Sequence, residues 1–181
     1  MFPQGQYKTI YIDPPWPERG GGKIKREADR HYALMSIKEI KALPIASLAD
    51  PEGCHLYMWT TNNYLPDALE CVKAWGFQYV TLITWCKDSM GLGQYFRGMT
   101  EHCIFATTQK KLPYKLEEGK RMQGVTGFVE PKREHSRKPE TMRKMIERVS
   151  YTPRIELFAR RAAPGWKVWG NEAPEEQEAA T

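Results

Sequence analysis

The sequence predicts an α/β protein built on a largely parallel sheet. Short runs of β-branched and aromatic residues alternate along the chain with segments of helical periodicity, the order typical of such a sheet. A length of 181 residues with 41% hydrophobic residues allows one substantial core. The sequence has no internal repeat, so we expect a single domain over residues 1–172 and a disordered acidic tail over 173–181.

The first expected strand covers residues 7–13, YKTIYID, and is rich in β-branched and aromatic side chains. It must stop there because Pro14 and Pro15 cannot donate hydrogen bonds to a neighbouring strand. A polar, glycine-rich loop follows. Ser36, with Glu39 three residues later, then has the pattern of a capping box and predicts the start of a short helix.

The rest of the chain repeats this order. Further strands are expected over residues 54–61, 77–87, 102–108, 154–160 and 166–170. One helix should begin near Pro66 and stop at Gly76. Its expected apolar face comprises Leu65, Leu69, Val72 and Trp75. A second helix is expected over residues 140–149, whereas the basic segment 109–138 lacks periodicity and is interpreted as loop.

Composition restricts the function only loosely. The net charge of +5 and the pI near 9.0 are compatible with a polyanionic partner, although many basic proteins bind no nucleic acid. The cysteines are far apart and form no Cys-x-x-Cys pair, which indicates buried free thiols and no metal site. These cysteines are Cys54, Cys71, Cys86 and Cys103. The chain shows no signal peptide and no membrane-length apolar stretch, so we expect a cytoplasmic protein without membrane contact.

The tetrapeptide Asp13-Pro14-Pro15-Trp16 follows the first strand, at the sheet edge where open α/β sheets bind ligands. It suits methylation of an exocyclic base amine, which needs two hydrogen-bond acceptors to expose the nitrogen lone pair. The Asp13 carboxylate and the rigid Pro14 carbonyl would supply them. Trp16 would stack on the base, an interaction worth roughly 1–3 kcal/mol. The alternative is a strand-ending turn with a surface tryptophan.

Several later stretches occur in a fixed order after this tetrapeptide: HYALMS, LYMWTTN, EHC, HSRKPE, IELFAR and WGNE. With these motifs the chain, from about residue 7 to 172, resembles the MT-A70 family of S-adenosylmethionine-dependent adenine-N6 methyltransferases, in a minimal phage- or bacterial-type form. The resemblance implies a Rossmann-like class I methyltransferase fold in which the catalytic motif precedes the cofactor motif. It also implies that Asp13, Pro14, Pro15 and Trp16 are the catalytic residues.

The resemblance also assigns a pocket for S-adenosylmethionine. Lys138, in HSRKPE, should reach the methionine carboxylate of the cofactor from beside a helix start, where cations and N–H donors favour anions. The alternative is a solvated lysine. The cofactor-binding residues implied are Asp13, Lys138, Phe158, Arg160, Asn171 and Glu172. Asn171 and Glu172 would contact the ribose hydroxyls, or else form a simple turn. The adenine end of the cofactor would be held by residues 4–6 or by a loop.

Other residues are implied for the substrate. Tyr32 would flank the target base, and Glu101 would lie at the edge of the active site. His31 is either a substrate contact or a loop residue. His102 and Cys103 cannot form a catalytic triad with Glu101, because adjacent strand residues point to opposite faces. Core positions are expected for Trp59, Trp75 and Trp85.

Basic residues crowd two loops expected near the catalytic motif. They are Arg19, Lys23, Lys25, Arg26 and Arg30 in the first, and Lys110, Lys111, Lys115, Lys120, Arg121, Lys132, Arg133 and Arg137 in the second. These residues either form solvated surface or bind the phosphates of a nucleic acid. If they bind phosphates, the substrate-binding residues are Lys23, Lys25, Arg26, Trp16, Tyr32 and Glu101.

We expect DNA rather than RNA as the substrate, because the chain is small and shows no added RNA-binding domain, zinc finger or partner helix. A free nucleotide in place of a polymer is a further alternative. A homodimer is expected because so small a domain offers little surface to a duplex. The alternatives are methylation of adenine N6 in RNA, methylation of cytosine N4 in DNA, a non-catalytic nucleic-acid-binding subunit of the same fold, and a regulator that binds nucleotides without turnover.

Overall fold

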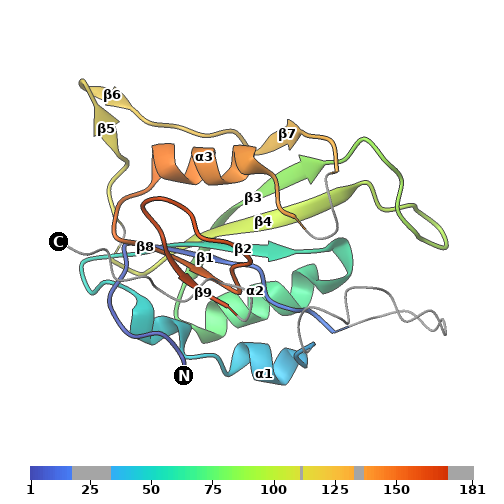
Figure 1. The fold of residues 1–181 in the computed structure, drawn as a ribbon, viewed down its shortest axis with the longest axis horizontal. Helices are drawn as coiled ribbons and strands as arrows, with labels where there is room; N and C mark the ends of the chain where they lie inside the picture. Colours follow the sequence, from blue (N-terminus) through green and yellow to red (C-terminus); the bar gives the residue numbers. More distant parts are fainter. Residues whose placement is uncertain (18–33, 111, 133–136, 171–181) are drawn as a thin grey trace.

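The computed structural model describes residues 1–17, 34–110, 112–132 and 137–170, and these form a seven-stranded sheet with helices on both faces (Figure 1). The strands of this sheet, in chain order, are β1 (Thr9–Ile12), β2 (His55–Thr60), β3 (Gln78–Cys86), β4 (Thr100–Thr107), β7 (Gly127–Val129), β8 (Arg154–Leu157) and β9 (Lys167–Trp169). The helices are α1 (Ile37–Lys41), α2 (Leu65–Ala74) and α3 (Glu140–Val149), with short 3-10 turns η2 (Ile45–Leu48) and η3 (Asn62–Tyr64). A separate hairpin contains β5 (Leu116–Glu117) and β6 (Lys120–Arg121).

The strand order is β7-β3-β4-β2-β1-β8-β9, and it determines where a ligand can bind. Within this sheet β4 runs antiparallel to both of its neighbours, and the other pairs are parallel. The carboxyl ends of the six other strands therefore meet the amino end of β4 at one edge, here called the carboxyl edge. The sequence prediction of a mostly parallel α/β sheet is confirmed.

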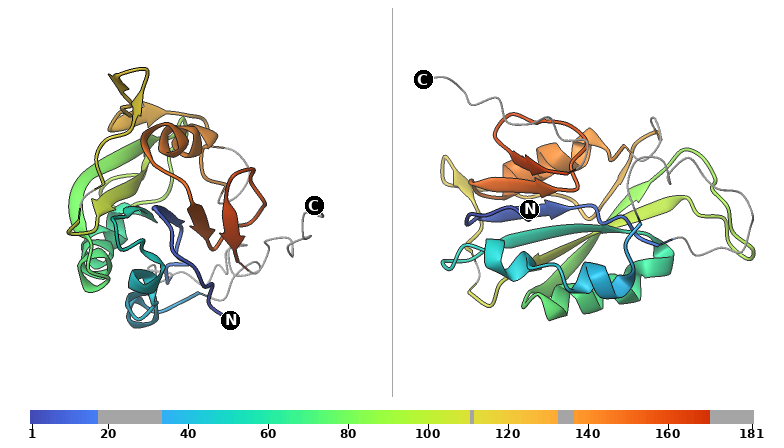
Figure 2. Two further views of the ribbon diagram at one scale, coloured as in Figure 1. Left: turned by 90° about the vertical axis from the view of Figure 1, so that its left-hand side faces the viewer. Right: turned by 60° about the horizontal axis from the view of Figure 1, so that its bottom comes forward.

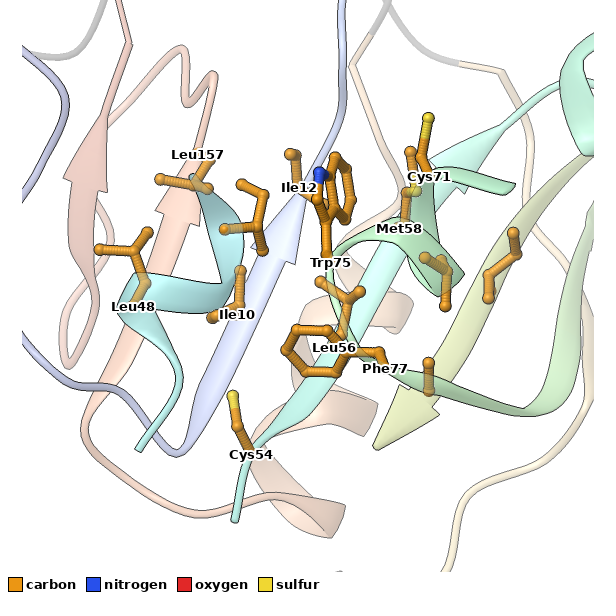
Figure 3. Packing of buried hydrophobic residues seen from close by; sticks show 14 of the residues in the cluster. Ile10, Ile12, Leu48, Cys54, Leu56, Met58, Cys71, Trp75, Phe77 and Leu157 are labelled. Carbon is orange, nitrogen blue, oxygen red and sulfur yellow. The ribbon is translucent and has the colours of Figure 1, made fainter. Parts of the chain in front are cut away.

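The side chains of the central strands alternate between two buried layers, as the two-residue period of a strand requires. Ile10 and Ile12 of β1 pack with Leu56 and Met58 of β2 against α1, α2 and η2 (Figure 3). Tyr11, on the opposite face, packs in the layer beneath α3. Figure 2 shows α3 on one side of the sheet and the other two helices on the other side. Complete burial of such a side chain stabilises the fold by about 1.5–3 kcal/mol.

Several local predictions are confirmed. The first strand ends before the prolines, and Ser36 and Glu39 form the capping box of α1. Gly76 ends α2 with φ +79°, in the left-handed region that favours glycine. The cysteines are unpaired; Cys86 is partly exposed and the others are buried. Trp59, Trp75 and Trp85 lie in the core.

Other expectations require correction. Leu69 is 36% exposed, because the buried face of α2 is centred on Ala68, Cys71 and Val72 and leaves Leu69 at its margin. The strand expected over residues 154–160 ends at Leu157, since Phe158 has φ +59° and leaves the extended conformation. The basic segment expected to be loop contains β7, which pairs in parallel with β3.

The expected disordered tail lies outside the described residues, as does the glycine-rich loop after Trp16. None of the helices in the described part of the chain has the length and apolar character needed to cross a bilayer.

Candidate active site

The segment after β1 forms a fixed turn at the carboxyl edge. Pro14 is buried, and its carbonyl accepts a hydrogen bond from the Trp16 backbone N–H at 2.9 Å. The Pro15 carbonyl accepts another from the N–H of Met35 at 3.0 Å. The two prolines restrict φ, so these bonds hold the Asp13 carboxyl group and the Pro14 carbonyl in one arrangement.

The Trp16 ring is held from two sides. Its Nε1–H donates to the carbonyl of Trp59 in β2 at 3.0 Å. Its ring stacks on Tyr64 with centroids 5.2 Å apart and planes 11° apart, and the Tyr64 hydroxyl donates to the Pro17 carbonyl. Because Tyr64 covers one face of the indole, only the opposite face can receive a flat ligand.

Four side chains form a row of alternating charge at the carboxyl edge, here called the charge row: Lys87, Glu101, Lys138 and Asp13. The Lys138 Nζ lies 3.0 Å from Asp13 Oδ2 and 3.1 Å from Glu101 Oε2. Glu101 also binds Lys87 through its other oxygen. The two ammonium groups lie near the Trp59 and Trp85 rings, with Lys138 at 5.4 Å and Lys87 at 4.9 Å from the centroids. Sheet pairing brings these residues together, since Trp85 of β3 is opposite Glu101 of β4.

Burial and pairing set the protonation of the charge row. Burial raises the pKa of Asp13, although Lys138 opposes the shift. Burial alone would also raise the pKa of Glu101, but Lys138 and Lys87 outweigh it and lower that pKa to about 2. The pKa of Lys138 would fall on burial, yet Asp13 and Glu101 raise it above its usual value. At neutral pH Glu101 is therefore an anion and Lys138 a cation.

A second group of polar residues holds the amino end of β4. The Nε2 of His102 lies 2.7 Å from the Asn62 side-chain oxygen, and its Nδ1 lies 3.0 Å from the Thr84 hydroxyl. The Asn62 amide nitrogen donates to Thr100 at 3.1 Å. An Nε2–H tautomer satisfies both ring contacts, and burial lowers the pKa of His102, so the ring is neutral. His102 is thereby hydrogen-bonded to residues that follow β2 and lie in β3.

Aromatic rings gather where β8 and β9 end. The Phe158 ring lies 5.3 Å from the ring of Trp169, which in turn lies 5.2 Å from Phe2. The Trp169 Nε1–H donates to the Met1 carbonyl at 3.0 Å. The amino-terminal residues therefore reach the carboxyl edge beside Phe158. That residues 4–6 or a loop hold the adenine of the cofactor stays a prediction.

Beneath this edge, Glu156 of β8 and Arg143 of α3 form a partly buried ion pair at 2.6 Å. Burial raises the pKa of Glu156 to about 7, with Asp13 adding to the shift and Arg143 opposing it. The pair joins the helix that follows Lys138 to the strand that precedes Phe158. The charge of Asp13 thus acts on a carboxyl group in the layer beneath α3.

The structure brings together Asp13, Pro14, Pro15, Trp16, Glu101 and Lys138, and Arg160 is close enough to Asp13 to act on its charge. Phe158 lies at the end of the next strand, β8. The roles assigned to these residues stay predictions. Other predicted residues lie outside the described part of the chain: Lys23, Lys25, Arg26, His31, Tyr32, Asn171 and Glu172.

Sequence reasoning missed Lys87, Asn62, Tyr64, Arg143 and Glu156. Asn62 is the last residue of the motif LYMWTTN and Lys87 is the last residue of a predicted strand, so the sequence marked both positions without indicating a role for either. The Tyr64 ring contact and the ion pair between Arg143 and Glu156 depend on tertiary packing.

Comparisons with known proteins assign the chain to a family. The family model described as MT-A70 matches residues 7–172. The chain is 30% identical to a type II methyltransferase, M.MunI, of Mycoplasma sp, over 97% of this chain and 81% of that protein. It is 29% identical to the human N(6)-adenosine-methyltransferase catalytic subunit METTL3 over 93% of this chain and 28% of that protein. A probable N(6)-adenosine-methyltransferase of rice matches at 30% over 93% of this chain and 23% of its own length.

Proposed function

The chain belongs to the MT-A70 family and is a methyltransferase, and from that premise we propose that it transfers a methyl group from S-adenosylmethionine to the N6 amine of adenine in DNA. One observation carries the proposal. The turn after β1 carries the Asp13 carboxyl group, which is paired with Lys138, and then the backbone carbonyl of Pro14, and it ends in a tryptophan with one face covered by Tyr64.

The amine of adenine is a poor nucleophile because its lone pair is delocalised into the ring. In our account the Asp13 carboxylate and the Pro14 carbonyl each accept a hydrogen bond from one N–H of the amine. The nitrogen lone pair can then face the methyl group. The Pro14 oxygen already accepts one hydrogen bond from Trp16, and a carbonyl oxygen has a second lone pair available. The raised pKa of Asp13 makes it a stronger base than an exposed aspartate. Trp16 offers its remaining face to the base.

The side chains at this edge fit S-adenosylmethionine, which supplies an electrophilic methyl group on a positively charged sulfur. An ammonium group has three donors, and Lys138 uses two of them on Asp13 and Glu101, which leaves one for the cofactor carboxylate. The neighbouring Arg137 Nε is buried and has no hydrogen-bond partner among the described residues. These two cations precede α3, whose amino terminus also favours an anion.

DNA is the polymer that we propose. Of the three relatives described above, the type II methyltransferase is the one that this chain covers over most of its length, at 81%. The N(6)-adenosine-methyltransferases support adenine as the base, although this chain spans 28% or less of the two described above. The charge of +5 is consistent with a polyanionic substrate.

Substitution of Asp13 tests the chemistry. Asp13→Ala should abolish methyl transfer, since the carboxylate acts on the substrate amine. The cofactor dissociation constant should stay within a few-fold although Asp13 adjoins the cofactor pocket, because Lys138 keeps its ion pair with Glu101. Asp13→Asn should also lose most activity, because the amide lacks the charge and can present a donor where an acceptor is needed. Methyl transfer would be measured with labelled cofactor and cofactor binding by calorimetry. Near-wild-type turnover by Asp13→Asn would contradict this account of amine activation.

A further inference from the structure

The loop that joins β3 to β4, residues 87–99 and here called the β3–β4 loop, exposes large apolar side chains beside the candidate active site. Tyr95 is 93% exposed and Phe96 is 91% exposed. Other exposed apolar residues of the loop are Met90, Leu92 and Met99. Contiguous exposed apolar surface usually marks a binding site.

Hydrogen bonds fix the shape of this loop. The Gly91 N–H donates to the Gly98 carbonyl at 2.7 Å, and the Gly98 N–H donates to the Leu92 carbonyl at 3.3 Å. The Arg97 guanidinium group donates to the Gly91 carbonyl at 2.9 Å and to the Met90 carbonyl at 3.3 Å. A side chain at Gly93 would collide with the Phe96 backbone. The loop is therefore a closed turn with two aromatic residues at its tip.

The stems of the loop lead directly into the candidate active site. Lys87 at one end and Glu101, just past the other, both belong to the charge row. The Asp88 side chain accepts the backbone N–H of Lys132 at 3.1 Å, which ties the base of the loop to the segment after β7. Figure 1 shows the loop projecting outward past the carboxyl edge, on the side where β1 ends. A substrate that reaches Asp13 would pass close to this loop.

We propose that Tyr95 and Phe96 stack on bases that flank the target adenine once it leaves the duplex stack, an inference that rests on the proposed function. Chemistry on a base requires that base to be taken out of its stack, and its neighbours then have open faces. Exposed aromatic rings next to a cation are the usual platform for such bases. The Arg97 guanidinium group lies against the Met90 and Gly91 carbonyls of the same loop, and its positive charge favours a partner with phosphates over a neutral apolar partner.

The test measures binding to a fluorescent DNA oligonucleotide that contains an unpaired adenine. The double variant Tyr95→Ala with Phe96→Ala should raise the DNA dissociation constant about tenfold or more, since each stacked base contributes on the order of 1–3 kcal/mol by alanine substitution. The cofactor dissociation constant should not change. The slope of DNA affinity against salt should also stay the same, because the substitutions remove no phosphate contact.

Two control variants sharpen the test. Tyr95→Phe with Phe96→Tyr keeps both rings and should bind DNA like the wild type. Tyr79→Ala removes a tyrosine that is 52% exposed at the opposite end of β3, and should also leave DNA binding unchanged.

Two outcomes would overturn the inference. One is unchanged DNA affinity in the double alanine variant. The other is a wild-type dimer in sedimentation that becomes a monomer in this variant, which would show that the loop joins two copies of the chain. Failure of the proposed function would look different, because the wild type itself would then transfer no methyl group to DNA.

Discussion

Lys138 holds the centre of the charge row, and its substitution should affect both binding and stability. Lys138→Met keeps the hydrocarbon stem and removes the charge. We expect the cofactor dissociation constant, measured by calorimetry, to rise about tenfold or more, as for a charge-assisted hydrogen bond worth on the order of 1.5–3 kcal/mol. The free energy of unfolding should fall too, because two partly buried carboxyl groups, those of Asp13 and Glu101, lose their shared partner.

Lys110 provides the matched control. It pairs with Glu52 at 2.7 Å, and both side chains are largely exposed. Lys110→Met should therefore change neither cofactor affinity nor stability appreciably, since exposed pairs contribute little. Unchanged cofactor affinity in Lys138→Met would contradict the proposed pocket.

Glu101 should make stability depend on acid pH. Its pKa is about 2 in the folded chain, against 4.5 for an unpaired glutamate, so the unfolded chain takes up the proton first as the pH falls. The stabilisation from this group is complete above about pH 4.5 and is lost as the pH falls toward 2. In denaturant titrations between these values, the wild type should lose more stability than Glu101→Gln. Parallel losses in the two proteins would contradict the ion pairs assigned to Glu101.

Glu156 gives the opposite dependence and serves as the comparison. Its pKa is raised to about 7, so the folded chain keeps the proton that the unfolded chain releases near pH 4.5. As the pH rises from 4.5 to 7, Glu156 ionises in the unfolded chain before it ionises in the folded chain, so the free energy of unfolding of the wild type falls. Glu156→Gln should not show this fall.

At the scale of elements, the ends of β8 and β9 approach each other closely. The Ala159 N–H donates to the Trp169 carbonyl at 2.9 Å, and a Cβ atom at Gly170 would lie 2.8 Å from the Ala159 nitrogen. Gly170→Ala should therefore push these strand ends apart, lowering both the melting temperature and the cofactor affinity. Gly127→Ala is the control, since its added methyl group would meet only an ordinary contact at 3.8 Å. Equal behaviour of the two variants would show that the strand ends tolerate separation.

The elements that sequence could predict are those with a local physical cause. The prolines end β1, the capping box begins α1, and the helical spacing of apolar residues defines α3 at the bounds that were predicted. By contrast β7 has only three residues and lies at an edge, so it shows no pattern. The early end of β8 depends on the positive φ of Phe158, for which a phenylalanine gives no sequence signal.

The candidate site could be predicted only in part, for the same reason. The positions of the Asp13-Pro14-Pro15-Trp16 tetrapeptide and of Lys138 at the carboxyl edge follow from their motifs and from their places after a strand and before a helix. The charge row depends on tertiary contacts: the pairing of β3 with β4 brings Lys87 beside Glu101, and Glu101 then meets Lys138, which lies far along the chain. No local pattern contains that information.

At the scale of the whole molecule, the basic loop after Trp16 should govern affinity for a polyanion. Neutralising Lys23, Lys25 and Arg26 together should make the salt dependence of DNA binding shallower and raise the apparent substrate constant, because fewer counterions are released on binding. The cofactor constant should change much less. A triple variant with the wild-type salt slope and full activity on DNA would show that these residues are solvated surface.

The homodimer also stays a prediction at the scale of the whole molecule.

The central claim is the transfer of a methyl group to adenine N6 in DNA by the residues at the end of β1. The most direct measurement is mass spectrometry of nucleosides from DNA, and in parallel from RNA, each incubated with the protein and isotopically labelled S-adenosylmethionine. We predict labelled N6-methyladenine with the wild type and none with Asp13→Ala. Label in N4-methylcytosine, label in RNA alone, or no label in any nucleic acid would contradict the claim.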